Sequence, residues 1–252
     1  MNLTLQILGA ASAMPISDMN PSAQALSVHG RLFLIDCGEG TQRQIRRQHL
    51  SFIKVKAIFI SHIHGDHIFG IFGLLSTMAM YRRTEDLEIF APKSFAPILK
   101  FYLSYFSEGM AYEIKFHPID CKEPQLVYEL RGVEVYAFPL NHKIDCFGYR
   151  FGDWYAYCSD TAPFPELAQW LKGVRTIYHE ATYLREWADK AKAYYHSTTD
   201  DAAHCARDAG AKRLLIGHYT SRVRDCERFA SECREIFPDT VAVKDGDVFE
   251  ID

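Results

Sequence analysis

A run of apolar residues that ends in a cluster of imidazoles and a carboxylate constrains this 252-residue chain more than any other feature. Residues 55–61 read VKAIFIS, a continuous apolar run typical of a strand buried on both faces. The next six residues include His62, His64, Asp66 and His67. Since side chains two apart in an extended chain point the same way, His62 and His64 can share one metal ion, and Asp66 and His67 can serve a second. The alternative is a polar loop whose histidines are satisfied by ordinary hydrogen bonds.

Three further residues have the chemistry of metal ligands and stand at the ends of predicted strands. Four ligands do not fill two metal sites, so others must come from elsewhere in the chain. His142, Asp160 and His218 each follow a strand-like segment. A lone histidine is more often an ordinary surface or core residue, but three candidates at equivalent strand ends lie where a layered α/β fold gathers its site. We therefore predict that they join the first cluster.

The order of the predicted elements indicates the fold class. Strands come first, and strands alternating with helices follow. The strands are expected at residues 3–8, 24–28, 32–36, 55–61, 87–90, 112–116, 126–130, 133–138, 147–151, 155–158, 176–179, 213–216, 240–243 and 248–251. The helices are expected at 41–48, 69–80, 94–105, 164–171, 184–193, 198–209 and 226–237. With no repeat or linker, this mixture predicts one layered α/β/β/α domain over residues 1–252, with two sheets face to face and helices outside.

Charge and composition limit the partners of the chain. The 28 basic and 32 acidic residues leave a net charge of −4, so there is no broad basic field and any nucleic acid must be held locally. The noticeable basic groups are Arg43, Arg46 and Arg47, with Arg82 and Arg83 further on. They could contact an RNA backbone. The alternative, which we favour for Arg82 and Arg83, is the solvated face of a helix.

Cysteine usage and hydropathy bear on the compartment. Seven cysteines, an odd number without a C-x-x-C pair, argue against a disulfide framework or a structural zinc knuckle, so we expect a reducing cytoplasm. The longest apolar stretch, residues 68–80, contains two glycines and is too short to favour a membrane span. We expect a core helix there and no membrane partner.

The motifs resemble a known family. The cluster His62-x-His64-x-Asp66-His67 is similar to the metal motif of the metallo-β-lactamase superfamily, and within it the chain resembles the ribonuclease Z family of tRNA 3′-processing endonucleases. The matching segments, in the order of the family, are Leu8-Gly9-x5-Pro15, Asp36-Cys37-Gly38-Glu39-Gly40-Thr41-Gln42, Ser61 to Gly70, His142, Ser159-Asp160-Thr161, His179-Glu180-Ala181-Thr182, His196-Ser197-Thr198 and His218-Tyr219-x-Ser221-Arg222. The resemblance implies the metallo-β-lactamase-like αββα four-layer sandwich.

The resemblance also implies an assignment of the metal ligands. Two zinc ions are expected, because an imidazole-rich site with two carboxylates suits zinc, with manganese as the alternative. The first ion would be held by His62, His64 and His142, and the second by Asp66, His67 and His218. Asp160 would bridge the two ions, since a carboxylate has two oxygens to share.

Proton transfer in the implied reaction would involve three residues. Asp66 would orient or deprotonate the attacking water, and His196, held in the correct tautomer by Glu180, would protonate the leaving oxygen. The alternative for residues 196–198 is a helix N-terminus, at which we expect Ser197 to be the cap. Ser221 and Arg222 could grip a substrate phosphate, or form a solvated turn.

One departure from the family concerns the substrate. Ribonuclease Z carries a protruding arm, which grips the body of the tRNA, between the residues that correspond to His142 and Asp160. Here that interval is 18 residues and holds only a predicted hairpin, so the chain resembles an armless form. Precursor tRNA is the first substrate that we expect, docked on a homodimer to which the apolar helix contributes. A small cyclic or linear phosphodiester is the alternative, and a non-catalytic metal-binding relative is a third.

Overall fold

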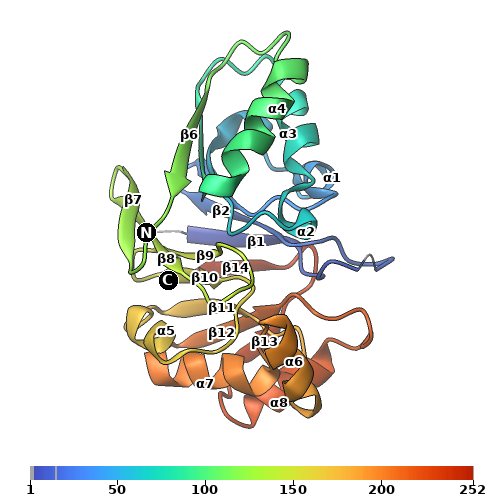
Figure 1. The fold of residues 1–252 in the computed structure, drawn as a ribbon, viewed down its shortest axis with the longest axis vertical. Helices are drawn as coiled ribbons and strands as arrows, with labels where there is room; N and C mark the ends of the chain where they lie inside the picture. Colours follow the sequence, from blue (N-terminus) through green and yellow to red (C-terminus); the bar gives the residue numbers. More distant parts are fainter. Residues whose placement is uncertain (1–2, 15, 252) are drawn as a thin grey trace.

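Two seven-stranded β-sheets packed face to face form the centre of the molecule, and helices cover the outer face of each (Figure 1). The structure is a computed structural model and describes residues 3–14 and 16–251. Pro15, the last residue of the first matching segment, lies outside the described residues. The two sheets with helices on their outer faces confirm the expected αββα four-layer sandwich. That residues 1–252 form one domain stays a prediction.

The first sheet combines antiparallel and parallel strands. Its order is β14 (Val248–Ile251), β1 (Leu3–Gly9), β2 (Ala23–Val28), β3 (Arg31–Ile35), β4 (Val55–Phe59), β5 (Leu87–Pro92) and β6 (Ile114–Ile119). The pairs from β3 to β6 are parallel and the others antiparallel. The helices on this side are α1 (Thr41–Arg47), the short α2 (Gly65–Ile68), α3 (Ile71–Met80) and α4 (Ala96–Phe106). The helix that the sequence predicts at residues 69–80 begins two residues later in the structure, at Ile71.

The second sheet carries three of the seven candidate ligands at its strand ends. Its order is β13 (Thr240–Ala242), β12 (Arg213–Gly217), β11 (Thr176–Glu180), β10 (Tyr155–Cys158), β9 (Phe147–Phe151), β8 (Val133–Pro139) and β7 (Gln125–Leu130). Strands β10 to β13 are parallel, so their carboxyl ends meet at one edge. Its helices are α5 (Pro165–Trp170), α6 (Ala188–Tyr194), α7 (Thr199–Ala209) and α8 (Glu227–Arg234).

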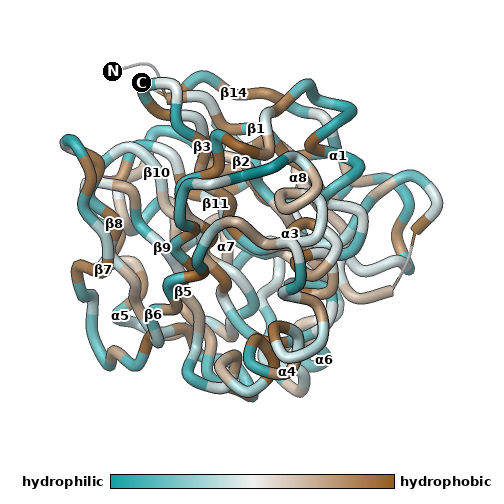
Figure 2. Tube along the Cα trace, turned by 90° about the horizontal axis from the view of Figure 1, so that it is seen from above, coloured by the Kyte–Doolittle hydropathy of each residue, from teal (hydrophilic) through white to brown (hydrophobic). Residues whose placement is uncertain are grey.

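Two apolar cores explain why the central strands read as continuous hydrophobic runs. Successive side chains of a strand point to opposite faces of its sheet. In β3, Phe33 and Ile35 face the core between the sheets, whereas Leu32 and Leu34 face the helices above. Figure 2 shows the corresponding pattern, with hydrophobic segments along the strands and hydrophilic ones on outer turns. Among the described residues, no helix is long and apolar enough to cross a bilayer.

Two local expectations are wrong. Arg83 is not on a solvated face: it is 2% exposed, and its guanidinium donates to the carbonyls of Glu85 (2.6 Å) and Asp86 (2.8 Å). Ser197 does not cap a helix, because its hydroxyl donates to the carbonyl of Thr161 (2.7 Å). The hydroxyl of the next residue, Thr198, caps α7 instead. Because Thr198 is the cap, the hydroxyl of Ser197 can instead link the segment before α7 to the loop that contains Thr161.

The loop that carries the histidine cluster packs against the backbone after β3. The amide of Gly70 donates to the carbonyl of Cys37 (2.9 Å), and a Cβ at Gly70 would lie 2.0 Å from the carbonyl oxygen of Gly38. A side chain at this position would therefore push two backbone segments apart. At Gly73, one turn later in α3, a Cβ would meet only the flexible end of Gln42, at 2.9 Å.

We expect Gly70→Ala to lower the free energy of unfolding by about 1–3 kcal/mol, because backbone cannot relax around the added methyl group. The matched control is Gly73→Ala, three residues further on and inside α3, which should leave that free energy unchanged or raise it by up to about 1 kcal/mol through better helix propensity. Urea unfolding followed by circular dichroism measures both. Equal effects of the two changes would contradict the close backbone packing.

Candidate metal centre

The candidate ligands lie at loop positions set by strand ends. His62, His64, Asp66 and His67 follow β4 and continue into α2, for which His64 is the extended residue before the first turn. The remaining three, His142, Asp160 and His218, follow β8, β10 and β12. Since the two sheets face each other, their ends bring both groups of loops to one place. All seven residues converge in one cluster, and five of them, His64, Asp66, His142, Asp160 and His218, line an open cavity.

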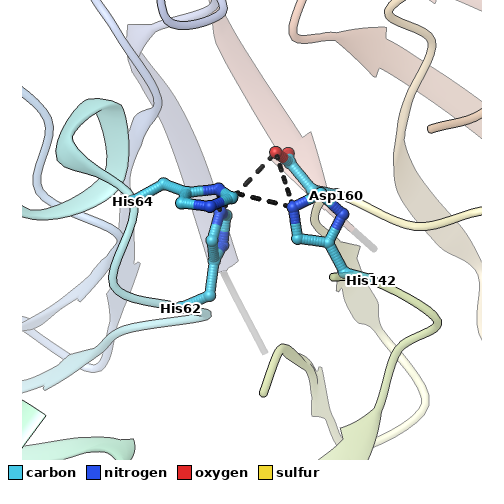
Figure 3. A group of neighbouring side chains, drawn as sticks. All are labelled: His62, His64, His142 and Asp160. Carbon is cyan, nitrogen blue, oxygen red and sulfur yellow. Dashed lines mark hydrogen bonds and ion pairs between the residues drawn. The ribbon is translucent and has the colours of Figure 1, made fainter. Parts of the chain in front are cut away.

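Four side chains form the first group. His62, His64, His142 and Asp160 offer ligand atoms that all lie within 4.8 Å of one another. His62 Nε2 is 2.9 Å from His64 Nδ1 and 3.6 Å from Asp160 Oδ2, and His142 Nε2 is 3.4 Å from His64 Nδ1. Figure 3 shows the three imidazoles and the carboxylate turned toward one another. These spacings suit four atoms around one ion at bond lengths of about 2 Å.

The second group lies beside the first and shares Asp160 with it. Asp66, His67 and His218 offer ligand atoms within 4.8 Å of one another. His218 Nε2 is 3.2 Å from Asp66 Oδ2 and 3.2 Å from Asp160 Oδ1, and His67 Nε2 is 3.4 Å from Asp66 Oδ2. Asp160 thus turns Oδ2 toward the first group and Oδ1 toward the second. This is the arrangement that a bridging carboxylate needs.

The residues present fit a divalent cation. His67 Nε2 and Asp160 Oδ1 are buried without a hydrogen-bond partner, although buried polar atoms are normally paired. Burial alone would lower the pKa of His67, but the carboxylates of Asp66, Asp160 and Asp36 raise it well above its ordinary value. The three carboxylates therefore stabilise positive charge at this point. A divalent ion supplies that charge and a partner for the two orphaned atoms.

Asp36 orients His67, a member of the second group, through a hydrogen bond. Its Oδ1 accepts a hydrogen bond from the amide of Ser61 (2.7 Å), and its Oδ2 accepts from the hydroxyl of Tyr157 (2.6 Å) and from His67 Nδ1 (2.7 Å). Because Nδ1 of His67 is the donor, Nε2 is left with its lone pair facing the cluster. Sequence reasoning quoted Asp36 in a matching string but assigned it no role.

Other neighbours set the tautomers of His142 and His218. His142 Nδ1 donates to the carbonyl of Tyr195 (2.9 Å), so its Nε2 faces the first group. His218 Nδ1 lies 2.8 Å from the hydroxyl of Thr182, which in turn donates to Glu180 (2.7 Å). Thr182 belongs to a matching segment of the sequence but is given no role there, and the Tyr195 carbonyl is not predicted, since neither residue type signals a metal site.

Glu180 and His196 form a separate ion pair at the edge of the cluster. Glu180 is fully buried, and its oxygens accept from His196 Nδ1 (2.9 Å) and from the amides of Thr161, Thr182 and Ser197. Burial opposes both charges, yet the pairing prevails: it holds the pKa of Glu180 at about 2 and raises the pKa of His196 to about 9. His196 Nε2, 4.0 Å from Asp160 Oδ2, therefore presents a proton toward the cluster.

An open cavity of about 850 Å³ gives access to this cluster. His64, Asp66, His142, Asp160, His196 and His218 line it, and so do the sequence-predicted Ser221 and Arg222. Ser221 is half-buried and Arg222 is exposed at the rim. The cavity thus brings together candidate metal ligands, His196 and, at its rim, Arg222.

Comparisons with known proteins agree with this geometry. Residues 31–219 match the family described as the beta-lactamase superfamily domain. The chain is 35% identical to ribonuclease Z of Porphyromonas gingivalis, over 96% of this chain and 97% of that protein. Human tRNase Z, short form, superposes with a TM-score of 0.87 at 26% identity and 99% coverage of both chains. A diphosphatase from the PhnP family shares the fold, with a TM-score of 0.78 at 22% identity over 99% of this chain and 98% of that chain.

The alignment with the Porphyromonas protein also shows a difference in length. It runs over 294 positions, of which 96% of this 252-residue chain fills about 242, so about 52 positions have no counterpart here. Between His142 and Asp160 this structure has only β9, a turn and β10. The interval between His142 and Asp160 thus holds a hairpin alone, as the sequence predicts. By sequence and by structure, the chain belongs to the beta-lactamase superfamily and, within it, to the ribonuclease Z family.

Proposed function

We propose that this protein is a metal-dependent phosphodiesterase that acts as an endonuclease on the 3′ ends of precursor tRNA. One observation carries the proposal: two groups of ligands share Asp160 at the bottom of a cavity that also holds the Glu180–His196 pair. A binding protein would need neither the shared carboxylate nor the proton donor. Relatives named ribonuclease Z and tRNase Z support the RNA substrate.

The donor set favours two zinc ions. His62, His64 and His142 would hold one ion, and Asp66, His67 and His218 the other, with Asp160 between them. Imidazole nitrogens with few carboxylates suit zinc, and manganese is the alternative. When bound, the ions would supply Lewis-acid polarisation of the phosphodiester and of an attacking water.

The residues of this chain would handle the protons and the substrate. Asp66, on the cavity wall beside His218, would orient the attacking water and accept its proton. His196 would donate the proton at Nε2 to the leaving oxygen, and Glu180 would keep it charged. Ser221 and Arg222, on the same wall, would bind a nonbridging phosphate oxygen.

The short interval between His142 and Asp160 bears on how tRNA is held. Without an arm, the body of the tRNA would dock on the surface of a homodimer. Exposed Phe69 and Met80, at either end of α3, provide apolar area for such an interface. The same short interval favours a second candidate function, hydrolysis of a small cyclic or linear phosphodiester. The seven cysteines, all free, are compatible with a cytoplasmic location.

A comparison of substrates tests the proposal directly. The purified protein should cleave precursor tRNA with a much larger kcat/KM than cyclic nucleotides, because the cavity continues beyond the ligand cluster. Asp66→Ala should lower turnover of precursor tRNA and of bis(p-nitrophenyl) phosphate by at least about 100-fold. The surface change Asp120→Ala is the matched control. Cleavage of small esters alone would leave the second candidate function in place of the first.

The metal content should follow the two groups of ligands. Protein purified without chelator should contain about two equivalents of transition metal by mass spectrometry, with zinc foremost. His62→Ala and His67→Ala should each lose about one equivalent, because they belong to different groups. The exposed His204→Ala should lose none. Absence of transition metal from the unaltered protein would refute the assignment.

The role of His196 should appear in the dependence on the leaving group. His196→Ala should lower kcat/KM by about 100-fold or more for precursor tRNA, whose ribose alkoxide needs a proton, and by less than about tenfold for bis(p-nitrophenyl) phosphate, whose phenolate does not. Glu180→Gln should give the same pattern with smaller losses. Equal losses on the two substrates would exclude His196 as the acid.

A further inference from the structure

Cations at the rim of the cavity lack acidic partners. Lys143, Lys190 and Arg222 line the same cavity as the ligand cluster, and no carboxylate of the described residues lies within 4.0 Å of their charged groups. Several surface cations elsewhere have such partners, as in Lys93–Asp120 and Lys115–Asp86. In a chain of net charge −4, uncompensated positive charge concentrated at one cavity indicates an anionic ligand.

Tyrosine rings hold the two lysines in place. Lys143 Nζ lies 4.8 Å from the centroid of the Tyr194 ring, and Lys190 Nζ lies 5.6 Å from the centroid of the Tyr183 ring. A cation–π contact positions an ammonium group without neutralising its charge. Each lysine therefore keeps both its charge and its hydrogen-bond donors for a ligand in the cavity.

The two pairs adjoin different parts of the candidate centre. Lys143 follows His142, and the carbonyl of Tyr195, next to Tyr194, accepts the hydrogen bond of His142 Nδ1 (2.9 Å). Tyr183 stands edge-on to the ring of His196, with centroids 6.1 Å apart. One lysine is thus linked to the first group of ligands and the other to the proton donor.

The number of cations bears on the size of the substrate. A small diester carries a single phosphate, which the metal centre itself would neutralise. RNA adds one phosphate for each further nucleotide, so cations beyond the centre favour a substrate with more than one phosphate, such as a polynucleotide. Tyr194 is 49% exposed and also offers a ring face on which a base can stack.

We propose that Lys143 and Lys190, each positioned over a tyrosine ring, bind the phosphates of the nucleotides next to the scissile one and so select RNA over small diesters. This inference rests on the proposed function. It names specificity-determining residues outside the ligand set, contributed by α6 and by the loop after β8, two segments far apart in the chain.

Turnover of two substrates tests the inference. The double variant Lys143→Gln/Lys190→Gln should lose about tenfold or more of kcat/KM on precursor tRNA relative to its change on bis(p-nitrophenyl) phosphate. Lys192→Gln is the matched control, because Lys192 is an exposed lysine of α6 outside this cavity and should leave both activities unchanged. Equal losses on both substrates, or no loss on RNA, would overturn the inference.

Binding provides a second readout that needs no turnover. The affinity for a fluorescein-labelled single-stranded oligoribonucleotide is measured by anisotropy at several salt concentrations, with each protein in an Asp66→Ala background. Each lost phosphate contact should make the slope of log K against log salt shallower by about 0.7. An unchanged slope would refute the phosphate contacts. Failure of the unaltered protein to cleave precursor tRNA, with the slope change present, would instead count against the proposed function alone.

Discussion

The buried carboxylate of Asp36 is the interaction on which the candidate site depends. It lies between the sheets with no exposed surface and accepts hydrogen bonds from Ser61, His67 and Tyr157, which belong to the loop after β4, to α2 and to β10. A buried carboxylate without hydrogen bonds would be costly in free energy, so the folded chain keeps all three donors in contact with it. Through them, the packing of the two sheets sets the direction of His67 Nε2 and the conformation of the histidine loop.

The carboxylates of the site have different environments and hence different parts in the chemistry. Asp66 and Asp160 lie among imidazoles, at a point where Oδ1 of Asp160 and Nε2 of His67 have no hydrogen-bond partner and a cation would supply one. Glu180 is fully paired with amides, a hydroxyl and His196, and therefore serves to keep that imidazole charged. A positively charged centre that binds the phosphodiester and a separate proton donor for the leaving oxygen are the two requirements of its hydrolysis.

Substrate selection is carried by the rim and not by the centre. Human tRNase Z and the PhnP-family diphosphatase share this fold, so the scaffold alone does not decide what is cleaved. In this chain a turn joins β9 to β10, and α6 with the loop after β8 forms the cavity edge. The lysine–tyrosine pairs there place positive charge beyond the ligands while leaving the centre unchanged.

The strands, the helices and the candidate ligands could be predicted because their signals are local: periodicity, strand ends, and the spacing of His62, His64, Asp66 and His67 depend on neighbouring residues. The three-dimensional packing was needed to show that Asp36 orients His67, that Arg83 is buried against carbonyls, and that Lys143 and Lys190 contact tyrosines at one cavity. These contacts join residues whose types are ordinary and whose surroundings are set by chain packing. Periodicity cannot reveal them, since burial and charge environment depend on which distant segments the two sheets bring together.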